Sequence, residues 1–385
     1  MREQFLCLAD FRTEAFSAVF RSQRNPSPTS SRMPLFRLQL IVTNSWQTKS
    51  SEEVKDFRAF VRCRQKLDER YQAAAMEANG SCVAGKGASL LTDPAQLIKE
   101  VETFLFDVDG VIWRGGKLIE GVPETLDMLR AMGKKLFFVT NNSTKSRRML
   151  QEKFRSLGLD IREEEVFSSA FAAAGYLKSI GFPTEKKVYI VGEEGIQQEL
   201  AQAGFQYLGG PEDGGKKVLL GTGKNVDFDR DVGAVVVGFD HYINYYKMVY
   251  ATLCIRENPG CLFIATNCDS VAHIIGQQEW PAGGTMVGSV RASTARTPIV
   301  VGKPATFMMD YLANKFNISK SKMCMVGDRL DTDILFGQAG GCKTLLVLSG
   351  VTDLKTLNSP ENTTYPDFYT NQLPDLLAAK KTMAA

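Results

Sequence analysis

The chain has 385 residues, of which 44% are hydrophobic and 23% charged, so it can bury a core large enough for more than one domain. Its 46 Lys and Arg nearly balance its 43 Asp and Glu, and this near-neutral charge excludes a broad nucleic-acid-binding face. No apolar run approaches the roughly 18 residues that span a membrane, and the eight cysteines are too dilute for a disulfide framework, which favours free thiols.

The segment up to residue 85 predicts a targeting region and a linker instead of a folded domain. It contains no acidic residue between Ala15 and Ser50, where arginines occur among many Ser and Thr. Such a composition is typical of an organelle transit peptide and lacks the compact apolar core of a secretory signal. A disordered basic tail is the alternative interpretation. Residues 80–87 are rich in glycine and predict a flexible linker, so we expect the folded body to begin near Leu91.

From Leu91 onward, short apolar segments alternate with amphipathic ones. This alternation predicts an α/β fold with a mainly parallel, Rossmann-like sheet that helices cover on both faces. The expected strands are Thr103–Val108, Lys135–Thr140, Val188–Val191, Ala234–Phe239, Cys261–Thr266, Ile299–Val301, Met323–Val326 and Thr344–Leu348. The expected helices are Glu124–Met132, Ser146–Leu157, Tyr245–Glu257, Thr306–Phe316 and Asp333–Ala339.

The first of these strands ends in two carboxylates and a glycine, in the sequence Phe104-Leu-Phe-Asp107-Val-Asp109-Gly110. In open α/β sheets, ligands bind outside the carboxyl ends of the strands, where these acids are expected to lie. A carboxylate such as Asp107 can attack phosphorus, and a second one such as Asp109 can protonate the leaving oxygen and then activate water. Taken alone the pattern is weak, because Asp and Gly are also common in surface turns.

Three later segments strengthen the interpretation. One strand ends at Thr140 and Asn141, whose hydroxyl and amide groups can donate to phosphoryl oxygens. Lys303 follows an apolar strand and can neutralise charge on a nucleophile and a phosphoryl group. A further strand precedes Asp328 and Asp333, and hard carboxylate oxygens of this kind suit a magnesium site. Each segment could be a helix cap or a solvated charge, but four in this order favour phosphoryl transfer.

In this order the four segments resemble the four motifs of the haloacid dehalogenase superfamily. The resemblance implies that Asp107 is the nucleophile and Asp109 the general acid and base. It also implies that Thr140 and Asn141 bind phosphate, and that Lys303 both binds phosphate and stabilises charge.

The same resemblance implies Mg²⁺ as the cofactor. Its ligands would be the side chains of Asp107 and Asp328 and the backbone carbonyl of Asp109. Asp333 would not ligate the metal directly but would support the waters bound to it.

At a finer level, the segments Asp107–Trp113, Thr140–Arg147 and Gly327–Ile334 resemble the p-nitrophenylphosphatase branch, and most closely its plant and algal phosphoglycolate phosphatases. In this branch an α/β cap of the C2 type is inserted between the second and third motifs. The resemblance therefore implies a cap at residues 188–297 and a core formed by residues 91–187 and 298–385.

The function implied is hydrolysis of 2-phosphoglycolate to glycolate and phosphate in photorespiration, in the chloroplast stroma. The alternatives are another small phosphoester such as pyridoxal phosphate, a non-catalytic scaffold that binds phospho-ligands, and a cytoplasmic location. We expect a small phosphorylated metabolite as the partner, with neither nucleic acid nor membrane, and a homodimer formed through the cap. Four residues of the expected cap are candidates for binding the substrate carboxylate: Arg256, Arg291, Arg296 and His241. Each could instead be a solvated surface residue, as most such residues are.

Overall fold

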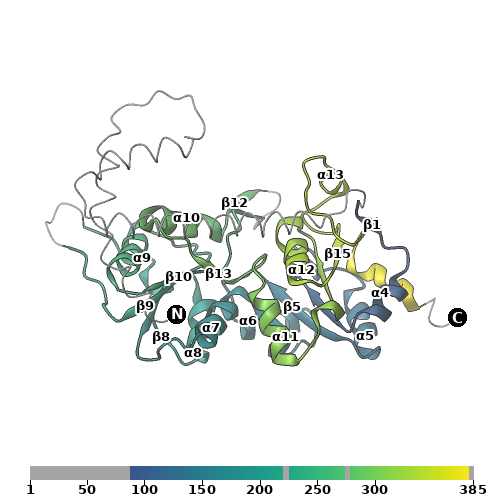
Figure 1. Cartoon of the computed structure of the whole chain (residues 1–385), viewed down its shortest axis with the longest axis horizontal. Helices are drawn as coiled ribbons and strands as arrows, with labels where there is room; N and C mark the ends of the chain where they lie inside the picture. Colours follow the sequence, from purple (N-terminus) through teal and green to yellow (C-terminus); the bar gives the residue numbers. More distant parts are fainter. Residues whose placement is uncertain (1–86, 220–224, 274–277, 381–385) are drawn as a thin grey trace, which may run out of the picture. The chain divides into compact units, whose positions relative to one another are not determined.

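The structure is a computed structural model that describes residues 87–219, 225–273 and 278–380 (Figure 1). The predicted targeting region and linker, residues 1–85, lie outside the described residues. Among the described residues, no helix combines the length and the apolar character that crossing a bilayer requires. The cysteines in this part of the chain are free: Cys268 is exposed, and four are buried, namely Cys254, Cys261, Cys324 and Cys342.

The first sheet has seven strands in the order β1-β16-β15-β14-β2-β5-β6, and all of its pairs are parallel. In this sheet β2 lies between β5 and β14, although β14 is far from the other two strands in the sequence. The strands are β1 (Ser89–Leu90), β2 (Thr103–Phe106), β5 (Lys135–Thr140), β6 (Val166–Ser168), β14 (Met323–Gly327), β15 (Lys343–Val347) and β16 (Phe368–Thr370).

Alternation along β2 shows how this sheet is buried on both faces. Phe104 and Phe106 pack into one hydrophobic cluster, whereas Leu105 packs into the other. The helices associated with this sheet are α4 (Pro94–Glu100), α5 (Val122–Ala131), α6 (Arg147–Ser156), α7 (Ser169–Ser179), α11 (Phe307–Phe316), α12 (Leu335–Gly340) and α13 (Leu354–Leu357). Short 3₁₀ or π-helical segments are η3 (Glu163–Glu165), η5 (Lys320–Lys322), η6 (Leu330–Ile334) and η7 (Leu373–Ala378).

A second parallel sheet has five strands in the order β13-β10-β9-β7-β8. It lies between β6 and β14 in the sequence, so the predicted α/β class with an inserted second α/β part is confirmed. The strands are β7 (Lys187–Val191), β8 (Gln206–Gly209), β9 (Val232–Val237), β10 (Leu262–Ala265) and β13 (Ile299–Val300). The helices are α8 (Glu194–Gln202), η4 (Gly210–Asp213), α9 (Tyr245–Glu257) and α10 (Gly283–Thr294). Among the described residues there are also two short antiparallel strand pairs, β3 (Trp113–Arg114) with β4 (Lys117–Leu118) and β11 (Val271–His273) with β12 (Glu279–Pro281).

Strand pairing bears on two of the expected boundaries. The expected strand at Ile299–Val301 was assigned to the core, but the structure pairs Ile299 with Ile264 of β10, in the second sheet. There β13 is the edge strand of the second sheet, next to β10. Strand β1, which ends at Leu90, pairs with β16 at the edge of the first sheet, close to the start of the folded body expected near Leu91.

Candidate active site

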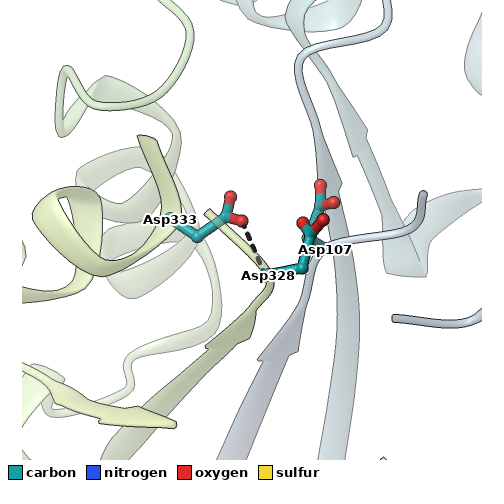
Figure 2. Close-up of side chains that lie close together, drawn as sticks. All are labelled: Asp107, Asp328 and Asp333. Atoms are coloured by element: carbon teal, nitrogen blue, oxygen red, sulfur yellow. Dashed lines mark hydrogen bonds between the residues drawn. The ribbon is translucent and has the colours of Figure 1, made fainter. Parts of the chain in front are cut away.

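The carboxyl ends of three neighbouring strands bring the predicted site residues together. Asp107 follows β2, Thr140 ends β5 and Asp328 follows β14. Because β2 is parallel to both neighbours, these three ends lie at the same edge of the sheet. Figure 2 shows the carboxylates of Asp107, Asp328 and Asp333, which offer ligand atoms within 4.8 Å of one another. All three residues are buried.

Lys303 connects this cluster to the rest of the sheet. Its ammonium group, on a residue that is 2% exposed, donates to Asp107 Oδ1 at 2.6 Å and to Asp333 Oδ1 at 2.7 Å. It also donates to the carbonyl of Val139 at 2.9 Å, so all three of its N–H groups are used. Burial alone would lower the pKa of Lys303, but the charges of Asp107 and Asp333 together raise it. The lysine is therefore a fixed positive charge beside Asp107, and a contact with phosphate requires the exchange of one of these bonds.

Negative charge exceeds positive charge in the cluster, where three carboxylates face one ammonium group. Burial raises the pKa of Asp107, with Asp333 acting in the same direction and Lys303 against it. Burial likewise raises the pKa of Asp328, followed by the charges of Asp333 and Asp107. A cation bound among these oxygens would remove the repulsion, and the donors are the hard oxygen ligands that Mg²⁺ and similar ions prefer. The residues present therefore fit a divalent metal.

The three carboxylates are not equally free to ligate. Asp333 uses both oxygens, since Oδ1 accepts from Lys303 and Oδ2 accepts from the backbone N–H groups of Asp328 and Arg329, each at 3.1 Å. Asp328 Oδ2 accepts from the N–H of Val351 at 2.7 Å. Asp107 Oδ1 accepts from Lys303. The second oxygens of Asp107 and Asp328 are the better candidates for direct contact with a metal.

The residue after Asp109 has to be glycine, because of its backbone conformation and because another residue lies very close to it. Gly110 has φ 88°, in the left-handed region that side chains rarely adopt. A Cβ at this position would also lie 2.5 Å from Asp328 Oδ2. The turn after β2 can therefore approach the carboxylate after β14 only because this residue is glycine.

Asp109 stands apart from the buried cluster. It is exposed, and its Oδ1 accepts a hydrogen bond of 2.7 Å from the indole N–H of Trp113. The predicted general acid is thus accessible to solvent, unlike the three buried carboxylates.

Thr140 and Asn141 have different surroundings, although both were predicted to bind phosphate. The Thr140 hydroxyl oxygen accepts from the N–H of Asn142 at 3.1 Å, which leaves its own O–H to donate. The Asn141 side chain accepts from the N–H of Lys303 at 2.9 Å and donates to the Lys303 carbonyl at 3.0 Å. It also donates to Asp269 Oδ2 at 3.1 Å. A phosphate contact by this side chain would require one of these bonds to be exchanged, and its present contacts fix the backbone of Lys303.

Two charged residues that were not predicted from the sequence lie beside this site. Asp269 comes shortly after β10, and burial raises its pKa while the hydrogen bond from Asn141 opposes that shift. The Arg329 guanidinium donates to both oxygens of Asp331, at 3.0 and 2.7 Å. The signal for Asp269 was present, since it is a carboxylate just after an apolar strand, as Asp107 is.

The carboxyl ends of the second sheet meet the loop after β5. Beyond β9 the N–H of Phe239 donates to the Ser143 hydroxyl at 3.3 Å, and beyond β10 the Asn267 side chain donates to the Asn141 carbonyl at 2.9 Å. This end of the second sheet is therefore the one beside the site.

The four residues predicted to bind the substrate carboxylate lie at different distances from the site along the second sheet and its helices. Arg296 donates to the carbonyls of Ile255 and Cys261, before the opposite, amino-terminal end of β10. Arg256, at the end of α9, donates to the Ser293 carbonyl, and Arg291 is exposed on α10. His241 follows the carboxyl end of β9, where its ring lies 2.9 Å from Glu193.

Comparison with known proteins places this geometry in a family. A haloacid dehalogenase-like hydrolase model matches residues 104–206, and a HAD-hydrolase-like model matches residues 300–376. The chain is 67% identical over 290 residues to a chloroplastic phosphoglycolate phosphatase (1A) of Arabidopsis thaliana, a match that covers 75% of this chain and 80% of that protein. It is 37% identical over 326 residues to human glycerol-3-phosphate phosphatase, covering 80% of this chain and 99% of that protein.

Solved structures agree with the sequence relatives. The p-nitrophenyl phosphatase from Archaeoglobus fulgidus superimposes with a TM-score of 0.63 at 32% identity, covering 72% of this chain and 99% of that one. The four motifs, the parallel sheet that presents them and these matches lead to one assignment. The chain belongs to the haloacid dehalogenase-like hydrolases, in the branch that contains the p-nitrophenyl and phosphoglycolate phosphatases.

Proposed function

We propose that the chain is a Mg²⁺-dependent phosphatase that hydrolyses 2-phosphoglycolate to glycolate and phosphate through an aspartyl-phosphate on Asp107. The observation that carries the proposal is the buried contact between Lys303 and Asp107, beside two further carboxylates at the end of β14. The substrate is suggested by the names of Arabidopsis relatives that are 67% and 60% identical to the chain.

In the first step Asp107 attacks phosphorus and the bond from phosphorus to the substrate oxygen breaks. Asp109 gives its proton to that oxygen, so glycolate leaves as an alcohol. In the second step Asp109 takes a proton from water, the water oxygen attacks phosphorus, and the bond to Asp107 breaks to release phosphate. Lys303 holds Asp107 in place throughout, and Thr140 can donate its O–H to a phosphoryl oxygen.

The metal would be held by the Asp107 and Asp328 side chains and by the Asp109 carbonyl. When bound, Mg²⁺ supplies positive charge to the phosphoryl oxygens and to the crowded carboxylates. Asp333, whose oxygens already accept from Lys303 and from two backbone N–H groups, would act on it through water.

We further propose that residues 188–297 form the cap and that residues 91–187 and 298–385 form the core, with the edge strand β13 contributed back to the cap sheet. Among the residues predicted to bind the substrate carboxylate, the position of His241 at the site end of β9 supports it over Arg296. A homodimer through the cap remains part of this proposal, as does a small metabolite as the partner.

The proposed location is the chloroplast stroma, where this reaction would serve photorespiration. Two relatives that are 67% identical carry the word chloroplastic in their names. A third, 60% identical, does not, so a cytoplasmic location is kept as the alternative.

The test is phosphate release from the purified chain, with Mg²⁺ or with excess chelator, on 2-phosphoglycolate, pyridoxal phosphate and glycerol 3-phosphate. We expect Mg²⁺-dependent release with the highest kcat/KM for 2-phosphoglycolate. A higher kcat/KM for another ester would overturn the substrate assignment. No release from any ester would leave the scaffold interpretation.

A further inference from the structure

We propose that Trp113 is a positioning residue for Asp109, and that its indole N–H orients the carboxyl group that protonates the leaving oxygen. The inference rests on the role proposed above for Asp109. It assigns a function to a residue whose side chain reaches neither the nucleophile nor the buried carboxylates through any hydrogen bond described in the structure.

The contact itself is short and specific. Trp113 Nε1 lies 2.7 Å from Asp109 Oδ1, and Trp113 is 1% exposed whereas Asp109 is exposed. An indole has one N–H and no acceptor, so this bond is the whole hydrogen-bonding capacity of the Trp113 side chain. A buried N–H left without a partner is costly, and the contact therefore stabilises one orientation of Asp109.

The turn after β2 sets the two side chains against each other. The N–H of Gly110 donates to the Trp113 carbonyl at 2.7 Å, and the N–H of Ile112 donates to the Val108 carbonyl at 2.9 Å. An isolated β-bridge also joins Asp109 to Trp113. The backbone thus doubles back within five residues and presents the indole edge to the carboxylate.

The ring is also contacted by two side chains of α6, the helix that follows the Thr140 segment. The Lys153 ammonium lies 3.9 Å from the centroid of the Trp113 ring, and the Phe154 ring centroid lies 4.9 Å from it. Burial lowers the pKa of Lys153 and the charge of Asp109 opposes that shift, which is consistent with the ammonium lying near the carboxylate. The indole therefore has little freedom to turn away.

The chemical consequence concerns which oxygen carries the proton. Because Asp109 Oδ1 accepts from the indole, the proton of the acid form belongs on Oδ2. A fixed carboxyl group then presents that proton to the leaving oxygen without a search among orientations. Loss of the indole N–H should slow the steps that need proton transfer and spare those that do not.

The test compares leaving groups in the Trp113→Phe variant, which keeps an aromatic ring but has no N–H. Departure of an alcohol such as glycolate needs the proton, whereas p-nitrophenolate leaves without one. We expect kcat/KM for 2-phosphoglycolate to fall by about 10- to 100-fold, out of the roughly 10²- to 10⁴-fold that a positioned acid contributes. For p-nitrophenyl phosphate we expect a fall of less than about threefold.

Two further variants make the comparison decisive. Trp280→Phe is the matched control, because Trp280 is 38% exposed and its indole donates to Gln278, so both substrates should be unaffected. Asp109→Asn removes the acid itself and should show the same split between substrates at least as strongly. In the double variant, Trp113→Phe should add little to Asp109→Asn, because the two residues act on one step.

Thermal unfolding supplies a readout that does not depend on activity or on a folded Trp113→Phe variant. Asp109→Asn retains an oxygen for the indole, whereas Asp109→Ala leaves the buried N–H without a partner and should unfold at a lower temperature. Equal unfolding temperatures for these two, or equal losses on both substrates in Trp113→Phe, would overturn the positioning role alone. If Asp109→Asn lowers kcat/KM equally for 2-phosphoglycolate and p-nitrophenyl phosphate, Asp109 is not the general acid, and this inference fails as well.

Discussion

Replacing Asp328 with Asn should stabilise the metal-free protein and abolish its stabilisation by Mg²⁺. In the absence of metal, Asp328 shares a buried cluster with Asp107 and Asp333, and only Lys303 opposes their charge. Asparagine keeps an oxygen that can accept from the N–H of Val351, so the backbone contact at 2.7 Å survives. The variant therefore loses a repelling charge and a metal ligand but little packing.

The size of the effect follows from the spacing of the carboxylates. Two unit charges at the 4.8 Å limit of the cluster repel by about 3 kcal/mol at an effective dielectric constant of roughly 20. Uptake of a proton relieves part of this repulsion, so we expect the free energy of unfolding to rise by about 1–3 kcal/mol at pH 8 in excess chelator.

The sign of the pH dependence follows from the raised pKa values. Burial raises the pKa of Asp107 from its ordinary value of 3.8 to about 7. A raised folded-state pKa means that the stabilisation is fully present below the unfolded value and is lost as the pH rises through the folded one. The metal-free wild-type protein should thus lose stability between pH 4 and about pH 7, and Asp328→Asn should lose less.

The assay is thermal unfolding at pH 5 and pH 8, with chelator and with Mg²⁺. At a concentration of about 100 times its Kd, Mg²⁺ should stabilise the wild type by about 2.7 kcal/mol and the variant by almost nothing. If Asp328→Asn is less stable than the wild type in chelator at pH 8, the repulsion argument is wrong. If Mg²⁺ stabilises both proteins equally, Asp328 is not a ligand.

Three other outcomes are expected. Asp107→Asn should fold normally but release no phosphate in a colorimetric assay, and residual activity of a tenth of the wild type would contradict the covalent mechanism. Activity lost to chelator should return with Mg²⁺ and return poorly with Ca²⁺, whose larger and more flexible oxygen shell suits this alignment badly; equal recovery would refute the argument. Gly195→Ala should destabilise the fold by about 1–3 kcal/mol in chemical unfolding, because the new Cβ would lie 2.5 Å from the Lys145 backbone. Gly288→Ala is the control, since a Cβ there meets nothing within 4 Å. Equal stability of the two variants would rule out the clash.

Long, regular patterns in the sequence predicted most of the elements that position the site. The strand Lys135–Thr140 and the helix Tyr245–Glu257 match the structure residue for residue, because an apolar run or a capped helix determines each locally. The helix Ser169–Ser179 was missed, since eight of its eleven residues are buried and it has little amphipathic pattern to detect. The two-residue strand Ser89–Leu90 is defined by its partner β16 and has no signal of its own.

The site was predictable to the extent that its residues follow apolar strands. Asp107, Thr140 and Asp328 were placed at one edge of a sheet on that argument, and they do lie there. The contacts of Asn141 were not predictable, because they depend on how a segment more than 100 residues away approaches the loop after β5. The hydrogen bond from Trp113 to Asp109 likewise depends on the geometry of a turn, which the amino-acid sequence does not specify.

The order of strands in the first sheet has a consequence for how the chain is made. Strand β2 pairs with β5 soon after both are synthesised, but its other neighbour, β14, ends at Gly327. Roughly 190 residues separate the end of β5 from the end of β14. At a rate of synthesis of about 5–20 residues per second, they take on the order of 10–40 s to emerge. During that interval one edge of an apolar strand is open to pairing with other chains, whereas the second sheet is continuous from Lys187 to Val300 and can form without waiting. Protection by a chaperone is therefore needed most by the half-built first sheet, in the interval between the synthesis of β5 and that of β14.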